Sequence, residues 1–170
     1  MTSQENIVLG VDPGTATTGY GIIAKKHGIG SVQAIEYGVI VTQKELPLSE
    51  RLYIIYQKIN HLIKNYHPTE VAVEEIFFNK NSKTAISVGE ARGVVLLNAA
   101  MQSIPVFEYT PLQVKQSVVG YGRAKKEQVV YMVKTILNIN EEKLTPDDVA
   151  DALAVAICHA FQSGTNYSYV

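Results

Sequence analysis

The order of the periodic segments constrains the fold of this chain more than any other feature of its sequence. Three short runs rich in apolar and β-branched residues come first, at residues 7–11, 20–24 and 32–41. Gly28 and Gly30 suit a hairpin connection between the second and third runs. The economical interpretation is that the chain opens with three consecutive antiparallel strands.

Strands and helices alternate after this opening. Apolar residues at helical spacing predict a helix over residues 49–66, and buried-type runs predict strands at 71–77 and 105–109. Further helices are predicted over residues 84–101, 112–118, 127–137 and 145–161. This order favours an α/β domain with a mixed five-stranded sheet and helices on both faces. Such sheets gather their chemistry at strand ends and adjacent helix termini.

Length and composition limit the class of protein. A chain of 170 residues, with 46% apolar and 18% charged residues, suits one domain and excludes low-complexity disorder. A single cysteine, Cys158, excludes an internal disulfide framework and favours the cytoplasm. Residues 1–8 do not have the pattern of a signal peptide, and no apolar run approaches the ~20 residues of a membrane-spanning helix. We therefore expect one domain over residues 1–170, located in the cytoplasm without a membrane partner.

Charge is unevenly distributed, although the formal net charge is only −1. Lysine and arginine exceed acids by five between residues 79 and 135, whereas acids exceed lysine by four between residues 141 and 151. A basic segment beside an acidic one is typical of a protein that handles a polyanion through bound cations. Taken alone, the charge pattern favours the simpler interpretation of a random surface distribution.

The four aspartates of the chain occupy informative places. Asp12 directly follows the first strand, at a Pro-Gly turn. Asp147, Asp148 and Asp151 lie in the first turn of the last helix, where acids stabilise a helix N-terminus by about 0.3–1 kcal/mol each. That effect accounts for Asp147 and Asp148. Asp151, however, precedes the apolar run 152–157, and a carboxylate entering a buried helix usually needs a partner or a metal.

A pair of glutamates, Glu74 and Glu75, interrupts the apolar strand at 71–77. Successive side chains of a strand point to opposite faces, so one glutamate can face each side. A strand end that reaches solvent explains the pair equally well. If Asp12, one glutamate and the aspartates of the last helix converge, their oxygens form the ligand set that Mg²⁺ or Mn²⁺ prefers. Zinc-ligand spacing, a P-loop and a serine nucleophile elbow are all missing from the sequence.

Two phenylalanines, Phe77 and Phe78, lead from this strand into a polar, basic loop. It is difficult to bury both of these consecutive side chains where a strand leads into a polar loop. One of them can serve as an exposed platform on which a nucleic-acid base stacks, an interaction worth about 1–3 kcal/mol, while the other anchors the loop in the core.

Taken together, the segments resemble the RuvC-type Holliday junction resolvases, which are crossover junction endodeoxyribonucleases of the RNase H-like fold. The resemblance extends from about residue 7 to about residue 159. The matching stretches lie at residues 9–14, 18–21, 73–77, 80–81, 90–93, 105–120 and 148–154. The first stretch alone also resembles the Asp-x-Gly-Thr turn of sugar kinases and actin-like ATPases, but the motifs in this order are highly specific.

The resemblance implies a set of site residues. Its four catalytic, metal-binding carboxylates correspond to Asp12, Glu74, Asp148 and Asp151. The family therefore selects Glu74 from the glutamate pair and Asp148 rather than Asp147. The DNA-binding residues that it implies are Phe77, as the stacking aromatic, and the basic residues Lys115 and Lys126.

The resemblance also implies an activity and partners. Members act as homodimers on four-way DNA junctions and cut them symmetrically with Mg²⁺, for which Mn²⁺ substitutes, at two ions per active site. The nicks carry a 5′-phosphate and a 3′-hydroxyl. A branch-migration helicase complex is a candidate partner. The family places its dimer contact near the predicted helix at 84–101, whose small residues allow a second helix to approach closely: Ala85, Gly89, Ala91 and Gly93.

Two alternative functions also fit the sequence. A non-catalytic module that binds junctions would keep the fold, but the presence of all four carboxylates argues against it. An actin-fold phosphotransferase would explain the turn at Asp12, but such enzymes close two domains over a nucleotide and this chain has length for one.

Overall fold

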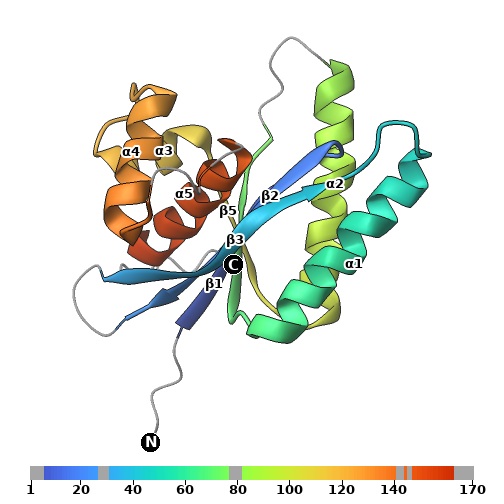
Figure 1. Ribbon diagram of the computed structural model, residues 1–170, viewed down its shortest axis with the longest axis horizontal. Coiled ribbons are helices and arrows are strands. Elements are labelled where there is room, and N and C mark those ends of the chain that lie inside the picture. The colour runs from blue at the N-terminus through green and yellow to red at the C-terminus, as the bar shows by residue number, and fades with distance from the viewer. Residues whose placement is uncertain (1–5, 27–30, 77–81, 141–143, 145–146, 163–170) are drawn as a thin grey trace, which may run out of the picture.

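The five strands form one mixed sheet in the order β3-β2-β1-β4-β5 (Figure 1). The computed structural model describes residues 6–26, 31–76, 82–140, 144 and 147–162. The strands are β1 (Asn6–Asp12), β2 (Thr17–Lys25), β3 (Val32–Val41), β4 (Glu70–Glu74) and β5 (Val106–Tyr109). Strands β1, β2 and β3 pair antiparallel, whereas β4 pairs parallel to both β1 and β5. The sheet predicted from the order of the segments is therefore confirmed.

In the described part of the chain, five helices cover the two faces of the sheet (Figure 1). They are α1 (Leu48–Tyr66), α2 (Ser82–Met101), α3 (Pro111–Val119), α4 (Lys126–Leu137) and α5 (Asp147–Gln162). Side chains of α1 and α2 form one apolar core with the sheet, and those of α3, α4 and α5 form the other. None of the described helices is long and apolar enough to cross a membrane.

Strand β4 ends earlier than the sequence predicted, at Glu74 rather than at Phe77. Both neighbouring strands stop at the same level, because β1 runs into Pro13 and β5 is followed by Thr110, the N-cap of α3. The backbone N–H of Glu75 still donates to the Tyr109 carbonyl at 2.8 Å. Beyond that point β4 has no partner strand, so apolar character alone could not extend it.

Helix boundaries also shift slightly from the predicted ones. Helix α2 begins two residues earlier than expected, and α5 begins at Asp147 in the described part of the chain. The predicted start of the last helix at residue 145 lies outside the described residues. Helix α3 ends at Gly120, which takes the left-handed conformation at φ 93°.

Helix α5 packs unusually close to the sheet because glycines lie beneath it. A Cβ atom at Gly10 of β1 would lie 2.7 Å from the Cβ of Ala156, and one at Gly21 of β2 would lie 2.7 Å from Cγ of Leu153. Both distances are too short for real carbon atoms. The bare backbone of β1 and β2 therefore sets how near α5 lies, and this helix carries the acidic residues described next.

Candidate active site

Two carboxylates lie side by side at the carboxyl ends of neighbouring parallel strands. Asp12 is the last residue of β1 and Glu74 is the last residue of β4. The register pairs Val11 with Val73, one residue before each acid. The edge of the sheet where parallel strands end is where α/β proteins commonly place their chemistry.

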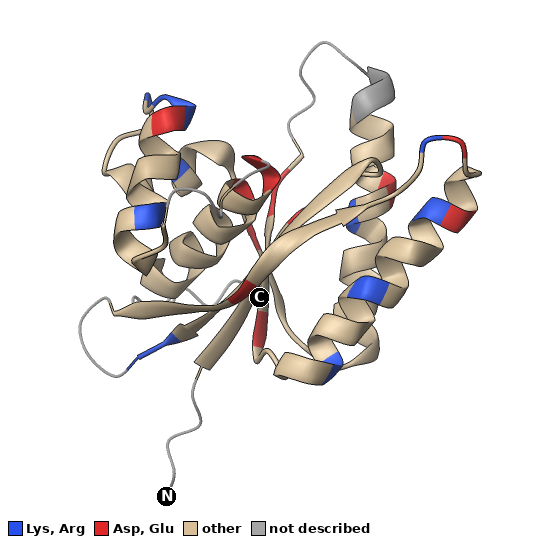
Figure 2. Ribbon diagram, viewed as in Figure 1, with Lys and Arg blue, Asp and Glu red and all other residues tan. Residues whose placement is uncertain are grey.

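The first turn of α5 brings further acids to the same edge. Asp12 pairs across the sheet with Gly19 of β2, and a Cβ atom at Gly19 would lie 3.1 Å from the Cβ of Asp148. The start of α5 therefore lies over the end of β1. Asp151 follows one turn later along the helix and is partly buried. Figure 2 shows acidic segments gathered where the start of α5 meets the end of β4.

The pKa values show that these carboxylates share one electrostatic environment. Burial, with the charges of Asp151, Glu74 and Asp148 adding to it and Lys126 opposing it, raises the pKa of Asp12 from 3.8 to about 7. Burial and, to a smaller extent, the charge of Asp151 together raise the pKa of Glu74 to about 6. Confined like charges favour protonation unless cations compensate them.

Two lysines provide part of that compensation. Lys126 places its Nζ 3.1 Å from Oδ2 of Asp151 and 3.4 Å from Oδ2 of Asp147. Burial still raises the pKa of Asp151, although the bond to Lys126 acts in the other direction. Lys115 and Lys126 both lower the pKa of Glu74. Asp147, for which the sequence predicted a role in the helix N-terminus but no catalytic role, is thus a second and more exposed partner of Lys126.

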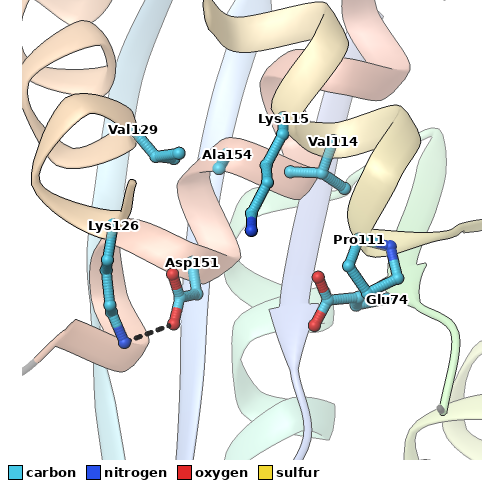
Figure 3. A pocket seen from close by; sticks show the side chains of 8 residues that line it. All are labelled: Glu74, Pro111, Val114, Lys115, Lys126, Val129, Asp151 and Ala154. Carbon is cyan, nitrogen blue, oxygen red and sulfur yellow. Dashed lines mark ion pairs between the residues drawn. The ribbon is translucent and has the colours of Figure 1, made fainter. Parts of the chain in front are cut away.

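A cavity of about 170 Å³ lies between these charged groups (Figure 3). Its polar lining comes from Glu74, Asp151, Lys115 and Lys126, and its apolar wall from Pro111, Val114, Val129 and Ala154. Figure 3 shows the Lys115 ammonium directed toward the space between the carboxylates of Asp151 and Glu74. Lysine ammonium groups and carboxylates thus face one another across a space that is large enough for a small anion and its bound waters.

The chemistry of the donor set fits a hard divalent cation. All four predicted carboxylates lie in the described residues and offer only oxygen, which Mg²⁺ and Mn²⁺ prefer. In this arrangement, no three acidic, histidine or cysteine side chains of the described residues are placed to hold an ion. One reason is visible in Figure 3, because the carboxylate of Asp151 is turned to Lys126.

The turn after Asp12 is held by hydroxyl groups that the sequence did not single out. The hydroxyls of Thr15 and Ser87 are hydrogen-bonded at 2.7 Å, which joins the turn to α2. The Thr42 hydroxyl donates to the Thr15 carbonyl and accepts a hydrogen bond from Nε of Arg51 at 2.9 Å. Threonines in a turn are too common to have predicted these contacts.

A second unpredicted set of contacts fixes α5 on the sheet. His159 is buried, with Nδ1 hydrogen-bonded to the Tyr109 hydroxyl at 2.7 Å and Nε2 to the Glu70 carboxylate at 2.8 Å. The bond to His159 lowers the pKa of Glu70, and burial raises the pKa of Tyr109 to about 12. One signal was available, since a histidine within the apolar part of α5 had to find polar partners.

The predicted DNA-binding residues divide into two groups. Lys115 and Lys126 both line the cavity beside the carboxylates, as described above. Phe77, the predicted stacking aromatic, lies outside the described residues.

The fold and the acidic edge together define an RNase H-like nuclease. The family model described as crossover junction endodeoxyribonuclease RuvC matches residues 8–159. This chain therefore belongs to the RuvC family. Membership of a nuclease family favours an endonuclease over both the phosphotransferase and the non-catalytic binding module.

Individual relatives agree with this assignment. A crossover junction endodeoxyribonuclease RuvC from Syntrophomonas wolfei is 59% identical over 152 residues, which cover 89% of this chain and 87% of that protein. One from Desulforamulus reducens is 57% identical over 160 residues, covering 94% and 96%. Among solved structures, Thermus thermophilus RuvC in complex with a Holliday junction substrate superposes with a TM-score of 0.88 at 39% identity, covering 93% of this chain and 94% of that one.

Proposed function

We propose that this chain resolves four-way DNA junctions by metal-dependent hydrolysis of phosphodiester bonds, with Asp12, Glu74, Asp148 and Asp151 as its catalytic carboxylates. The observation that carries the proposal is the convergence of the ends of β1 and β4 with the start of α5, beside a cavity lined by Glu74, Asp151 and two lysines. The Thermus thermophilus relative, solved with a Holliday junction, supports the choice of substrate. The products are nicks with a 5′-phosphate and a 3′-hydroxyl.

The four carboxylates would hold Mg²⁺, or Mn²⁺ in its place, at two ions per site. Bound ions of this kind supply positive charge at the scissile phosphate and lower the pKa of the attacking water. Asp12 and Glu74 come from the sheet, and Asp148 and Asp151 from α5, so each half of the ligand set has a rigid support.

The two lysines help the site to accept a phosphate in this proposal. Lys115 is directed into the cavity, where its ammonium can donate to a phosphate oxygen (Figure 3). Lys126 neutralises part of the charge of Asp151 and Asp147, which reduces the repulsion that an approaching DNA strand meets. Charge stabilisation and positioning then supply most of the catalysis.

The experiment that tests this function is a cleavage assay on a synthetic four-way junction. Each arm is end-labelled in turn, and the products are compared with and without Mg²⁺ on the junction and on a plain duplex of equal length. Paired nicks at symmetric positions, seen only on the junction and only with the metal, are the expected result. Cleavage of duplex and junction at equal rates would contradict junction resolution.

We expect Lys115 and Lys126 to bind DNA through charge. Replacing either lysine with alanine should weaken junction binding and lower the slope of log K against log salt by about one, since each phosphate contact contributes about 0.9. Binding is measured in Ca²⁺ over a range of salt concentrations, with Lys64→Ala on the exposed surface of α1 as the control. An unchanged slope for both variants would show that neither lysine has this role.

The partner we propose for the chain itself is a second copy. Helix α2 exposes large apolar side chains along one side: Ile86, Leu97 and Met101 are 56–62% exposed. Gly93 on the same helix has nothing within 4 Å of its Cβ position, so a neighbour could approach there closely. Two other small residues serve the chain's own packing, because Ala91 is buried in the core and Gly89 lies against Ile76.

Charge on this surface should therefore separate the homodimer. Leu97→Glu places a carboxylate in the centre of the exposed apolar side of α2 and should raise the dimer dissociation constant by more than about a hundredfold. Sedimentation equilibrium at micromolar concentration checks this, with Tyr53→Glu on the exposed surface of α1 as the control. A monomeric unmutated protein would contradict the homodimer.

Location and a further partner complete the proposal. Cys158 is a buried free thiol, which supports a cytoplasmic location. A branch-migration helicase complex is the candidate partner that would deliver junctions to the dimer.

A further inference from the structure

The turn that joins α3 to α4 exposes charge that the proposed mechanism does not use. Arg123 and Lys125 are exposed, and Tyr121 is 46% exposed. Neither Arg123 nor Lys125 forms an ion pair with any residue in the described part of the chain. The nearest acid along the chain is Glu127, which is also exposed, so the turn keeps a positive balance.

The backbone of this turn is held firmly at both ends. Gly120 takes the left-handed conformation at φ 93° and donates its N–H to the Gln116 carbonyl at 2.9 Å. At the other end, the N–H of Lys125 donates to Oε1 of Gln128 at 2.8 Å. Between them Ala124 is only 3% exposed and packs in the core. The chain therefore presents the exposed side chains from a rigid support, which lowers the entropy lost on binding.

The turn also adjoins the candidate active site. The residue after it is Lys126, which lines the cavity with Glu74 and Asp151, and the helix before it supplies Lys115 to the same cavity. Figure 2 shows the basic residues of this segment together at the start of α4, on the side of the molecule where the acidic edge lies. A DNA molecule bound at the cavity therefore lies beside this turn.

We propose that the turn formed by residues 120–125 binds the sugar–phosphate backbone of a DNA duplex arm, away from the scissile phosphate. Arg123 and Lys125 contact phosphates by charge, and the exposed ring of Tyr121 packs against a sugar. Contacts of this type position DNA without reading its sequence. The inference rests on the proposed function, since it assumes that the cavity receives a phosphate of a branched DNA.

The test uses the double variant Arg123→Ala/Lys125→Ala, in the full chain and with Ca²⁺ to support binding. Loss of two phosphate contacts should lower the slope of log K against log salt by about 1.8 on a junction with long arms. Between 50 and 200 mM salt, the unmutated protein should accordingly lose about tenfold more affinity than the variant. At saturating junction concentration with Mg²⁺, the unmutated protein and the double variant should nick at the same maximal rate. The variant should need a higher junction concentration to reach half of that rate.

Controls separate an arm contact from other effects. Lys58→Ala/Lys64→Ala removes two exposed lysines of α1 and should leave the slope unchanged. Arg123→Lys should keep the unmutated slope, because it preserves the charge. On a junction whose arms are trimmed to the base pairs next to the crossover, the double variant and the unmutated protein should bind equally. Thermal unfolding of the double variant should match that of the unmutated protein, because both side chains are exposed.

Two outcomes would overturn the inference: equal salt slopes for the double variant and the unmutated protein on long arms, or an equal loss of affinity on long and trimmed arms. Failure of the unmutated protein to nick any junction would count against the proposed function instead. In that event, the same comparison of slopes on plain duplex DNA would still decide whether the turn binds a DNA backbone.

Discussion

Glutamine in place of Glu74 should lower junction nicking by more than about a hundredfold while junction affinity stays equal or rises. The amide has nearly the volume of the carboxylate but lacks its charge and is a poorer ligand for a hard cation. Glu74 lies beside the cavity with a pKa raised to about 6, so removal of its charge also lowers the repulsion of DNA. Asp151→Asn should behave in the same way. Binding and nicking are measured on one labelled junction.

The neighbouring residue offers a matched control. Glu75 is exposed and does not line the cavity, so Glu75→Gln should nick at nearly the unmutated rate. Ca²⁺ in place of Mg²⁺ should support binding without cleavage, because Ca²⁺ accepts looser and higher coordination. If Glu74→Gln or Asp151→Asn nicks at the unmutated rate, that residue is not a catalytic ligand.

A gain in stability is the second large effect, expected for Asp12→Asn in the presence of a chelator. The pKa of Asp12 is about 7 in the folded protein, against an ordinary value of 3.8. The folded state therefore holds a proton that the unfolded state releases, and the stability from this group falls as pH rises from about 4 to about 7. Above that range the ionised carboxylate costs at most about 4 kcal/mol, which the amide avoids.

Urea unfolding at several pH values measures this effect. The stability advantage of Asp12→Asn should be largest near pH 8 and should vanish near pH 4, where Asp12 is protonated in both states. Glu50→Gln, at an exposed site on α1, should show no such pH-dependent advantage. If Asp12→Asn is no more stable than the unmutated protein near pH 8, burial and the neighbouring carboxylates do not raise the pKa of Asp12.

Much of the fold was predictable because apolar residues recur at a different spacing in its helices than in its strands. The helix ending at Tyr66 and the strand Val32–Val41 were predicted to within a residue, since apolar spacing reports which side of an element is buried. The end of β4 was not, because it depends on where two neighbouring strands stop. That information lies at Pro13 and Thr110, far along the chain from Glu74.

The candidate site was predictable only in part. Local context singled out Asp12 and Asp151, whereas the choice of Glu74 over Glu75 came from resemblance to the family. The structure gives the physical difference: Glu74 faces the cavity and Glu75 faces solvent. Which of two adjacent glutamates faces the cavity depends on how the strand is paired with its neighbours, and the spacing of residues within one strand does not show that pairing. The partners of His159 were unpredictable for the same reason, because they come from β4 and β5.

The close packing of α5 on the glycine backbone of β1 and β2 affects how this protein would lose activity when it is heated. Two of the proposed ligands are carried by the sheet and two by α5, so a small lift of that helix separates the two halves while every strand stays paired. A side chain wedged beneath α5, as in Gly10→Ala, would do the same at any temperature. On heating, nicking would then be lost at a lower temperature than the one at which the domain unfolds. Enzymatic activity would therefore report loosened packing of α5 before any spectroscopic signal of secondary structure changes.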